Sequence, residues 1–281
     1  MDEKKLISSL VELAFAEDIG DGDHTTLCCI PPTEIGSSKL IIKEDGILAG
    51  VEVAIGVFNK LDSNLKVEVY INDGAQVKKG DVAFIVKGKV QSILQAERLV
   101  LNIMQRMSGI ATVTSKYVKE LEGTSAKVLD TRKTTPGMRI LEKQAVKIGG
   151  GVNHRIGLFD MILLKDNHVD FAGGIENAIL RAKEYLENNK KDLKIEIEVR
   201  SLEELRDALG VGGVDRIMLD NFSPEKTREA VKIVNGKVEL ESSGGINFNT
   251  IREYALTGVD YISVGALTHS VMSLDMSLKA I

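Results

Sequence analysis

KIEIEV (194–199) and RIMLD (216–220) decide the fold class, because each is a short apolar stretch and a helix-forming segment separates them. Four more stretches of this kind follow one another roughly 20 to 35 residues apart: VLD (128–130), MILL (161–164), VELES (238–242) and YISVG (261–265). This rhythm predicts repeated βα units with right-handed crossovers. The α/β series closes into a barrel or lies as an open parallel sheet.

The N-terminal part of the chain has a different pattern. Residues 4–16 carry a helical apolar periodicity, and residues 37–90 alternate short apolar runs with turn sequences such as NDG and KKGD. This predicts an α+β domain with one short helix near 51–60. A long helical run over 91–121, interrupted at Gly109, then leads into the second domain.

Composition indicates a folded protein that binds no nucleic acid. The 281 residues are 43% apolar and 27% charged, which suits two globular domains. The net charge of −5 repels a phosphate backbone. No apolar run is long enough for a membrane helix and no secretion signal is visible, so we expect a cytosolic protein. Cys28 and Cys29 are expected to stay reduced, since adjacent cysteines seldom reach disulfide geometry.

Polar or glycine-rich sequence follows each predicted strand. In α/β barrels these loops converge on one face, where active sites lie. The segments are Asp130–Lys133, Lys165–His168, Glu198, Asp220–Asn221, Ser243–Gly245 and Gly265–His269. Residues far apart in the chain are therefore expected to line one pocket.

The cations among these residues predict a polyanionic ligand. Arg132, Lys133, Arg155 and Lys165 are all expected at this face, and guanidinium groups suit bidentate binding of carboxylates or phosphates. SSGGI (242–246) offers backbone amides before a helical segment, an arrangement that holds phosphate.

Two acidic residues complete the predicted site. Glu198 and Asp220 end neighbouring strands and are expected to hold Mg²⁺, directly or through water, or to accept hydrogen bonds from ribose hydroxyls. Glu196 faces the same side of its strand as Glu198, so the choice between them stays open. His154 and His168 lack the spacing of a zinc site.

At these residues the chain resembles the quinolinate phosphoribosyltransferase family. The resemblance runs from near residue 10 to the C-terminus, and its longest block, DTRKTTPGMRILEKQAVKIGGGVNHRIGLFDMILLKDNH (130–168), is highly specific. The other matching segments are EDIGDGDHTT (17–26), AERLVLNIMQRMSGIAT (96–112), IEIEV (195–199), IMLDN (217–221), ESSGGI (241–246) and GVDYISVGALTHS (258–270).

The resemblance implies a fold, a reaction and an assembly. The fold would be an N-terminal α/β sandwich domain (1–107, with 270–281 packing back on it) followed by an open, incomplete α/β barrel of the seven-stranded type (108–269). The reaction would join quinolinate to phosphoribosyl pyrophosphate with Mg²⁺, giving nicotinate mononucleotide, pyrophosphate and carbon dioxide for NAD synthesis. The chain would form a homodimer; further assembly into a hexamer is left open.

The family's functional residues map onto matching positions here. Arg98 would reach across the dimer interface into the partner's site. The substrate-binding set would then be Arg98, Thr131, Arg132, Lys133, His154, Arg155, Lys165, Glu198, Asp220, Ser243, Gly244, Gly265 and His269. Within it, Lys133, Lys165, Glu198 and Asp220 would be catalytic, and Ser243, Gly244, Gly265 and His269 would surround the 5′-phosphate.

Three other functions are weighed against this one. A related transferase that uses nicotinic acid needs fewer cations, because its substrate has one carboxylate. The stretch INDGAQVKKGDVAFIVKG (71–88) resembles a biotinyl or lipoyl carrier, but its turn lacks the attachment lysine motif. A barrel that binds a ligand without catalysis is the third.

Overall fold

The computed structural model describes residues 2–281, and the chain divides into two compact units. The first comprises the residues through Ser115, Thr134–Gly150 and Leu267–Ile281; the second comprises Lys116–Lys133 and Gly151–Ala266. The domain limits predicted from the sequence stay a prediction. No helix among the described residues is both long and apolar enough to span a membrane.

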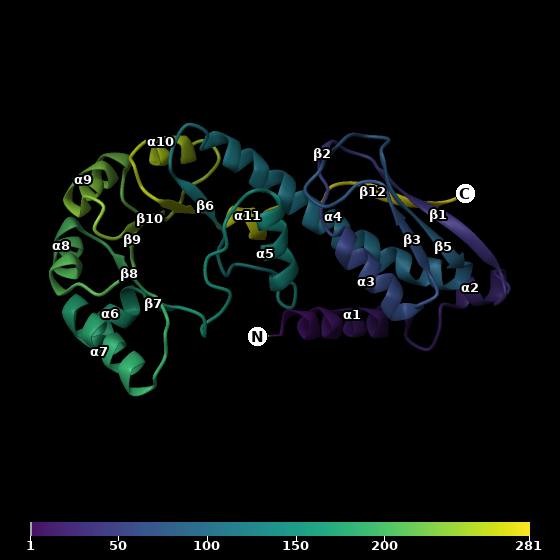
Figure 1. Ribbon diagram of the computed structural model, residues 1–281, viewed down its shortest axis with the longest axis horizontal. Coiled ribbons are helices and arrows are strands. Elements are labelled where there is room, and N and C mark those ends of the chain that lie inside the picture. Colours follow the sequence, from purple (N-terminus) through teal and green to yellow (C-terminus); the bar gives the residue numbers. More distant parts are fainter. Residues whose placement is uncertain (1) are drawn as a thin grey trace. The chain divides into compact units, whose positions relative to one another are not determined.

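The first unit is built on an antiparallel sheet of order β12-β1-β5-β3, with a separate β2-β4 pair (Figure 1). Its elements are α1 (Glu3–Ile19), α2 (His24–Cys29), β1 (Ile35–Ile42), β2 (Gly46–Ile47), α3 (Val51–Leu61), β3 (Lys66–Val69), β4 (Gln76–Val77), β5 (Val82–Lys89), α5 (Arg139–Ile148) and β12 (Met276–Ala280). The C-terminal strand β12 thus completes a sheet whose other strands lie near the N-terminus.

The core of this unit follows from alternation along the strands. Leu40 and Ile42 of β1 point to the same face and are fully buried. Phe58 of α3 meets Phe84 of β5 edge-on, with ring centroids 6.0 Å apart, so α3 covers a face of the sheet. Burial of each such side chain contributes about 1.5 to 3 kcal/mol.

The predicted interruption at Gly109 is wrong. Helix α4 (Val90–Glu120) passes through Gly109 without a break. A Cβ at this position would collide with the backbone carbonyl of Met272, so the glycine allows close packing of two segments. Local helix propensity suggested a break, and tertiary packing explains the residue instead.

The second unit is a parallel α/β sheet of order β6-β11-β10-β9-β8-β7. In Figure 1 the helices lie along the outer side of the curved sheet. Its elements are β6 (Lys127–Leu129), β7 (Ile162–Leu164), α6 (Asp166–Ala172), α7 (Ile175–Asn188), β8 (Ile195–Val199), α8 (Leu202–Val211), β9 (Arg216–Asp220), α9 (Pro224–Val234), β10 (Glu239–Ser243), α10 (Ile251–Ala255) and β11 (Tyr261–Ser263). The short helix α11 (Ala266–His269) follows β11.

This sheet confirms the predicted open α/β fold and all six predicted strands. Its edge strands are β6 and β7, so it does not close into a complete barrel. A single parallel bridge joins Leu129, in the edge strand β6, to Val152. Helix α10 begins at Ile251, so residues 246–250 separate it from the Gly244-Gly245 pair.

Candidate active site

Strand pleating divides the parallel sheet into an apolar and a polar face. In β8, Ile195, Ile197 and Val199 alternate with Glu196 and Glu198, and all five residues are buried. Successive strand residues point to opposite faces, so both glutamates lie on the face away from the three apolar side chains. The register extends this polar face across the sheet.

Paired positions on this face form rows across three strands. Glu196 lies beside Arg216, which lies beside Glu239. One row closer to the carboxyl ends, Glu198 lies beside Met218, and Met218 beside Glu241. Asp220 and Ser243 form the row at the strand ends.

A cavity of about 270 Å³ opens on this face. It is lined by Thr131, Arg132, Lys133, His154, Arg155, Leu163, Lys165, Met218, Glu241, Ser243 and Ser263. Seven of the predicted site residues are in this set, and they come from loops more than a hundred positions apart in the sequence. The structure therefore brings Thr131, Arg132, Lys133, His154, Arg155, Lys165 and Ser243 together.

Arg155 and Arg132 stand close enough to repel each other. Burial and the charge of Arg132 together hold the pKa of Arg155 below its ordinary value. The Arg155 Nη1 donates to the Met161 carbonyl at 3.3 Å. Its Nε is buried and has no hydrogen-bond partner within residues 2–281. A bound anion would relieve the repulsion and accept that unused hydrogen bond.

Glu198 and Asp220 lie at the same end of the sheet. Lys165 Nζ is 3.4 Å from Glu198 Oε2. Burial raises the pKa of Glu198; Lys165 opposes this effect, and the nearby Asp220 adds to it. Two carboxylates that repel each other beside a cation-lined cavity can hold a divalent cation.

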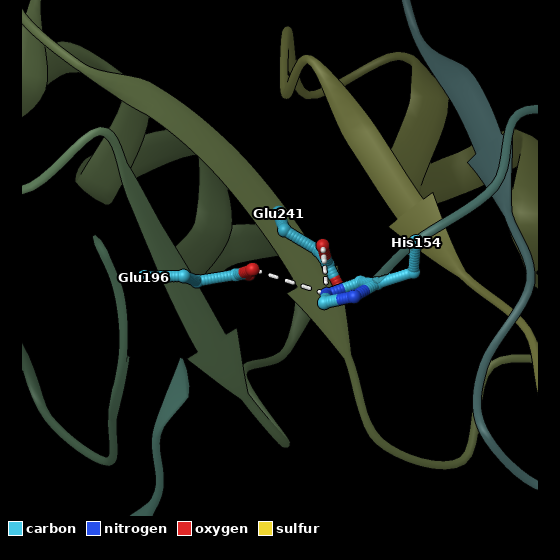
Figure 2. A group of neighbouring side chains, drawn as sticks. All are labelled: His154, Glu196 and Glu241. Atoms are coloured by element: carbon cyan, nitrogen blue, oxygen red, sulfur yellow. Dashed lines mark ion pairs between the residues drawn. The ribbon is translucent and has the colours of Figure 1, made fainter. Parts of the chain in front are cut away.

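Glu196 occupies a different environment from Glu198. It is fully buried, with its Oε2 3.0 Å from His154 Nε2, and Glu241 Oε2 approaches the same nitrogen at 3.4 Å (Figure 2). One atom from each of these three side chains lies within 4.8 Å of the others, so they also form a candidate metal-ligand set. Glu196 is thus in the interior and Glu198 near the strand ends.

The three side chains of this buried cluster shift one another's pKa values. Burial and the charge of Glu241 raise the pKa of Glu196 to about 7. Burial lowers the pKa of His154, but contact with the two carboxylates raises it to about 9 overall. The Arg155 amide donates to His154 Nδ1 at 2.7 Å, which requires an unprotonated Nδ1. The ring therefore uses Nδ1 to accept this hydrogen bond, and both carboxylates approach Nε2.

The loop after β10 depends on a glycine at 244. Gly244 has φ +96°, and a Cβ there would lie 2.6 Å from Asn221 Cγ. The Asn221 amide donates to the Ser243 carbonyl at 2.9 Å, which joins this loop to the end of β9. Gly265 lies two residues after Ser263, the last residue of β11.

Two predicted site residues lie in the first unit. Arg98 is on α4, and His269 ends α11. Their assignment to the site stays a prediction.

Sequence reasoning missed Glu241 and Arg216 as parts of the site. Both are charged residues in short strands; Arg216 pairs with Glu196 and Glu239, and Glu241 pairs with Met218. A charge at every second position of an otherwise apolar strand, as in IEIEV and ELESS, was the available signal.

A cation-lined cavity on an open parallel α/β sheet is typical of enzymes that act on small polyanions. Residues 110–279 match the family model of the quinolinate phosphoribosyl transferase C-terminal domain, and residues 23–108 match that of its N-terminal domain. The chain belongs to the quinolinate phosphoribosyltransferase family.

Individual relatives agree with this assignment. The chain is 44% identical to a quinolinate phosphoribosyltransferase (decarboxylating) of Nicotiana tabacum, over 97% of this chain and 82% of that protein. It is 40% identical to a probable nicotinate-nucleotide pyrophosphorylase (carboxylating) of Bacillus subtilis, over 97% and 92%. The solved nicotinate-nucleotide pyrophosphorylase of Francisella tularensis superimposes with a TM-score of 0.93 at 43% identity, covering 100% of this chain and 98% of that one.

Proposed function

We propose that this chain transfers the phosphoribosyl group of phosphoribosyl pyrophosphate to quinolinate. The quinolinate nitrogen forms a bond to the anomeric carbon as the bond to pyrophosphate breaks. The adjacent carboxylate then leaves as carbon dioxide, and the ring carbon takes up a proton, giving nicotinate mononucleotide. The observation that carries the proposal is the pair of repelling arginines, Arg132 and Arg155, at one cavity of a chain in this family.

The arginines suit the two carboxylates of the acid. Arg155 has a buried, unused Nε donor, and guanidinium groups bind carboxylates through paired hydrogen bonds. Thr131 and His154 line the same cavity. In this proposal the cations position the diacid, and the positive ring formed by ribosylation accepts the electrons left by decarboxylation.

Charge neutralisation at the leaving group is the remaining requirement. Positive charge develops on the ribose as pyrophosphate departs, so cations near pyrophosphate and carboxylates near the sugar stabilise the transition state. In this proposal Lys133 and Lys165 are the cations near pyrophosphate. Glu198 and Asp220 are the carboxylates near the sugar. Ser243, Gly244, Gly265 and His269 are proposed to surround the 5′-phosphate.

Mg²⁺ is proposed as the cofactor. The raised pKa of Glu198 and the charge of Asp220 beside it fit a site that a divalent cation would stabilise. Bound there, directly or through water, the ion would supply additional positive charge to the pyrophosphate.

We also propose a cytosolic location for the chain. We further propose a homodimer in which Arg98 enters the partner's site. The dimer is carried over from the resemblance of the segment around Arg98, AERLVLNIMQRMSGIAT (96–112), to this family. Arg98→Ala should then be inactive alone but should regain part of its activity when mixed with an inactive Arg155→Ala chain. Absence of such complementation after subunit exchange would argue against the shared site.

The proposed reaction is tested by offering the purified chain two acids. Quinolinate with phosphoribosyl pyrophosphate and Mg²⁺ should release pyrophosphate and carbon dioxide in equal amounts. Nicotinate should release little pyrophosphate, because one carboxylate leaves one arginine unpaired. Turnover of nicotinate that exceeds that of quinolinate would favour the alternative transferase.

A further inference from the structure

Four ionisable side chains form a buried cluster on the inner face of the parallel sheet. His154, Glu196, Arg216 and Glu241 make up this buried quartet. Glu196 and Glu241 are fully buried, and both point at His154 Nε2 from different strands (Figure 2). Only His154 and Glu241 also line the cavity.

Arg216 supplies the positive charge of the quartet. Its Nη1 lies 3.2 Å from Glu241 Oε2 and 3.9 Å from Glu196 Oε2, the same oxygens that face His154. Its guanidinium carbon also lies 4.0 Å from the centroid of the Tyr261 ring. The guanidinium therefore already supplies a positive charge to the two carboxylate oxygens that face His154.

His154 connects the quartet to the cavity through the backbone. Its Nδ1 accepts a hydrogen bond from the Arg155 amide at 2.7 Å, and its own amide donates to Asp130 Oδ1 at 2.9 Å. Asp130 is fully buried. The His154 ring therefore fixes the Arg155 backbone through Nδ1. The two glutamates of the quartet fix the ring through Nε2.

Arg155 needs such an anchor. It lies near Arg132, and the repulsion between the two guanidinium groups favours displacement of either one when no anion is bound. A displacement of about 1 Å at a substrate-positioning group can cost roughly 100-fold in rate or binding. A buried, charged scaffold opposes that displacement.

We propose that Glu196, Glu241 and Arg216 are positioning residues that act through His154 to hold Arg155 at the cavity, and that they thereby set the affinity for the acid substrate. The inference rests on the proposed function, since quinolinate affinity is its readout. It assigns a role to two residues that do not line the cavity, Glu196 and Arg216, and to Glu241, which does.

The test is a kinetic comparison of Glu241→Gln with the matched control Glu239→Gln. Glu239 lies on the same strand and the same face, and it contacts Arg216 at 3.2 Å, but its ion pair is with Arg216 and not with His154. Glu241→Gln should raise KM for quinolinate roughly 10- to 100-fold, with KM for phosphoribosyl pyrophosphate and kcat close to wild type. Glu239→Gln should match wild type in all three.

A charge-balanced double variant supplies the rescue. Glu241→Gln leaves Arg216 without one of its buried partners, so adding Arg216→Gln removes the unmatched charge. The double variant should bind quinolinate better than Glu241→Gln alone. If the double variant instead lost as much quinolinate affinity as the two single variants together, that result would contradict a shared positioning unit.

The outcomes distinguish a structural role from a positioning role. Loss of folded protein lowers kcat through the active fraction and leaves KM unchanged, which would support a purely structural role and overturn the inference. If Glu241→Gln does not fold, Glu196→Gln and the ¹⁵N spectrum of His154 in the wild-type chain replace it; a protonated Nδ1 would overturn the inference.

Wild-type turnover distinguishes the inference from the proposed function. A wild-type chain that does not convert quinolinate refutes both. A wild-type chain that converts it, beside a Glu241→Gln variant with normal KM, refutes the inference alone. A metal ion that is stoichiometric in the wild-type chain and lost in Glu241→Gln would also overturn the inference. Arg216 would then not be the cation of the quartet.

Discussion

Replacement of Arg155 by lysine keeps the positive charge at the cavity but removes the buried Nε donor. The Nε has no hydrogen-bond partner within residues 2–281, while Nη1 is already engaged by the Met161 carbonyl. We therefore expect the donor to be reserved for a substrate carboxylate. Lysine cannot reproduce the paired geometry of a guanidinium group.

The magnitude follows from the single hydrogen bond that is lost. A hydrogen bond to a charged group contributes about 1.5 to 3 kcal/mol. Since about 1.4 kcal/mol corresponds to a factor of ten, Arg155→Lys should raise KM for quinolinate roughly 10- to 150-fold. Arg155→Met, which also removes the charge, should bind quinolinate more weakly still, by about 2 to 5 kcal/mol relative to wild type.

The assay is a quinolinate titration at saturating phosphoribosyl pyrophosphate, with pyrophosphate release as the signal. Thermal unfolding of each variant serves as the control for folding. An Arg155→Lys enzyme with the wild-type KM for quinolinate would refute the assignment of the Nε donor to the acid.

Three further predictions concern protonation, charge and backbone. The pKa of Glu196 rises from its ordinary 4.5 to about 7, so between these pH values the folded chain holds a proton that the unfolded chain has lost. Stability should therefore fall as pH rises through this range, by up to about 1.4 kcal/mol per pH unit. Glu196→Gln should remove this contribution to the slope in denaturant titrations. Lys165→Met removes the partner that opposes the raised pKa of Glu198, so the acid limb of the kcat/KM profile should move to higher pH; an unmoved limb would contradict the pairing. Gly244→Ala places a side chain at φ +96° against Asn221, and should cost about 1 to 3 kcal/mol of stability together with a higher KM for phosphoribosyl pyrophosphate; unchanged melting would show that the loop adapts.

The sequence was sufficient to predict the parallel strands. Each is a short apolar run, and β9 has the predicted limits Arg216–Asp220. Because active-site loops follow parallel strands at one face, their convergence was also predictable. Thr131, Arg132 and Ser243 do line one cavity.

The depth of each charged residue was not predictable. Glu196 and Glu198 share a face in any strand model, but their environments differ because Glu196 pairs with Arg216 and Glu198 with Met218. That pairing depends on the sheet register, which no local pattern encodes. For the same reason the contact of Glu241 with His154 was missed, since the two side chains come from segments far apart in the chain.

The central claim, that Arg132 and Arg155 receive the two carboxylates of quinolinate, is tested most directly by an experimental structure of the chain with quinolinate bound. We predict one carboxylate within hydrogen-bond distance of Arg155 Nε and both guanidinium groups facing the acid. Quinolinate bound elsewhere, with neither arginine in contact, would contradict the account.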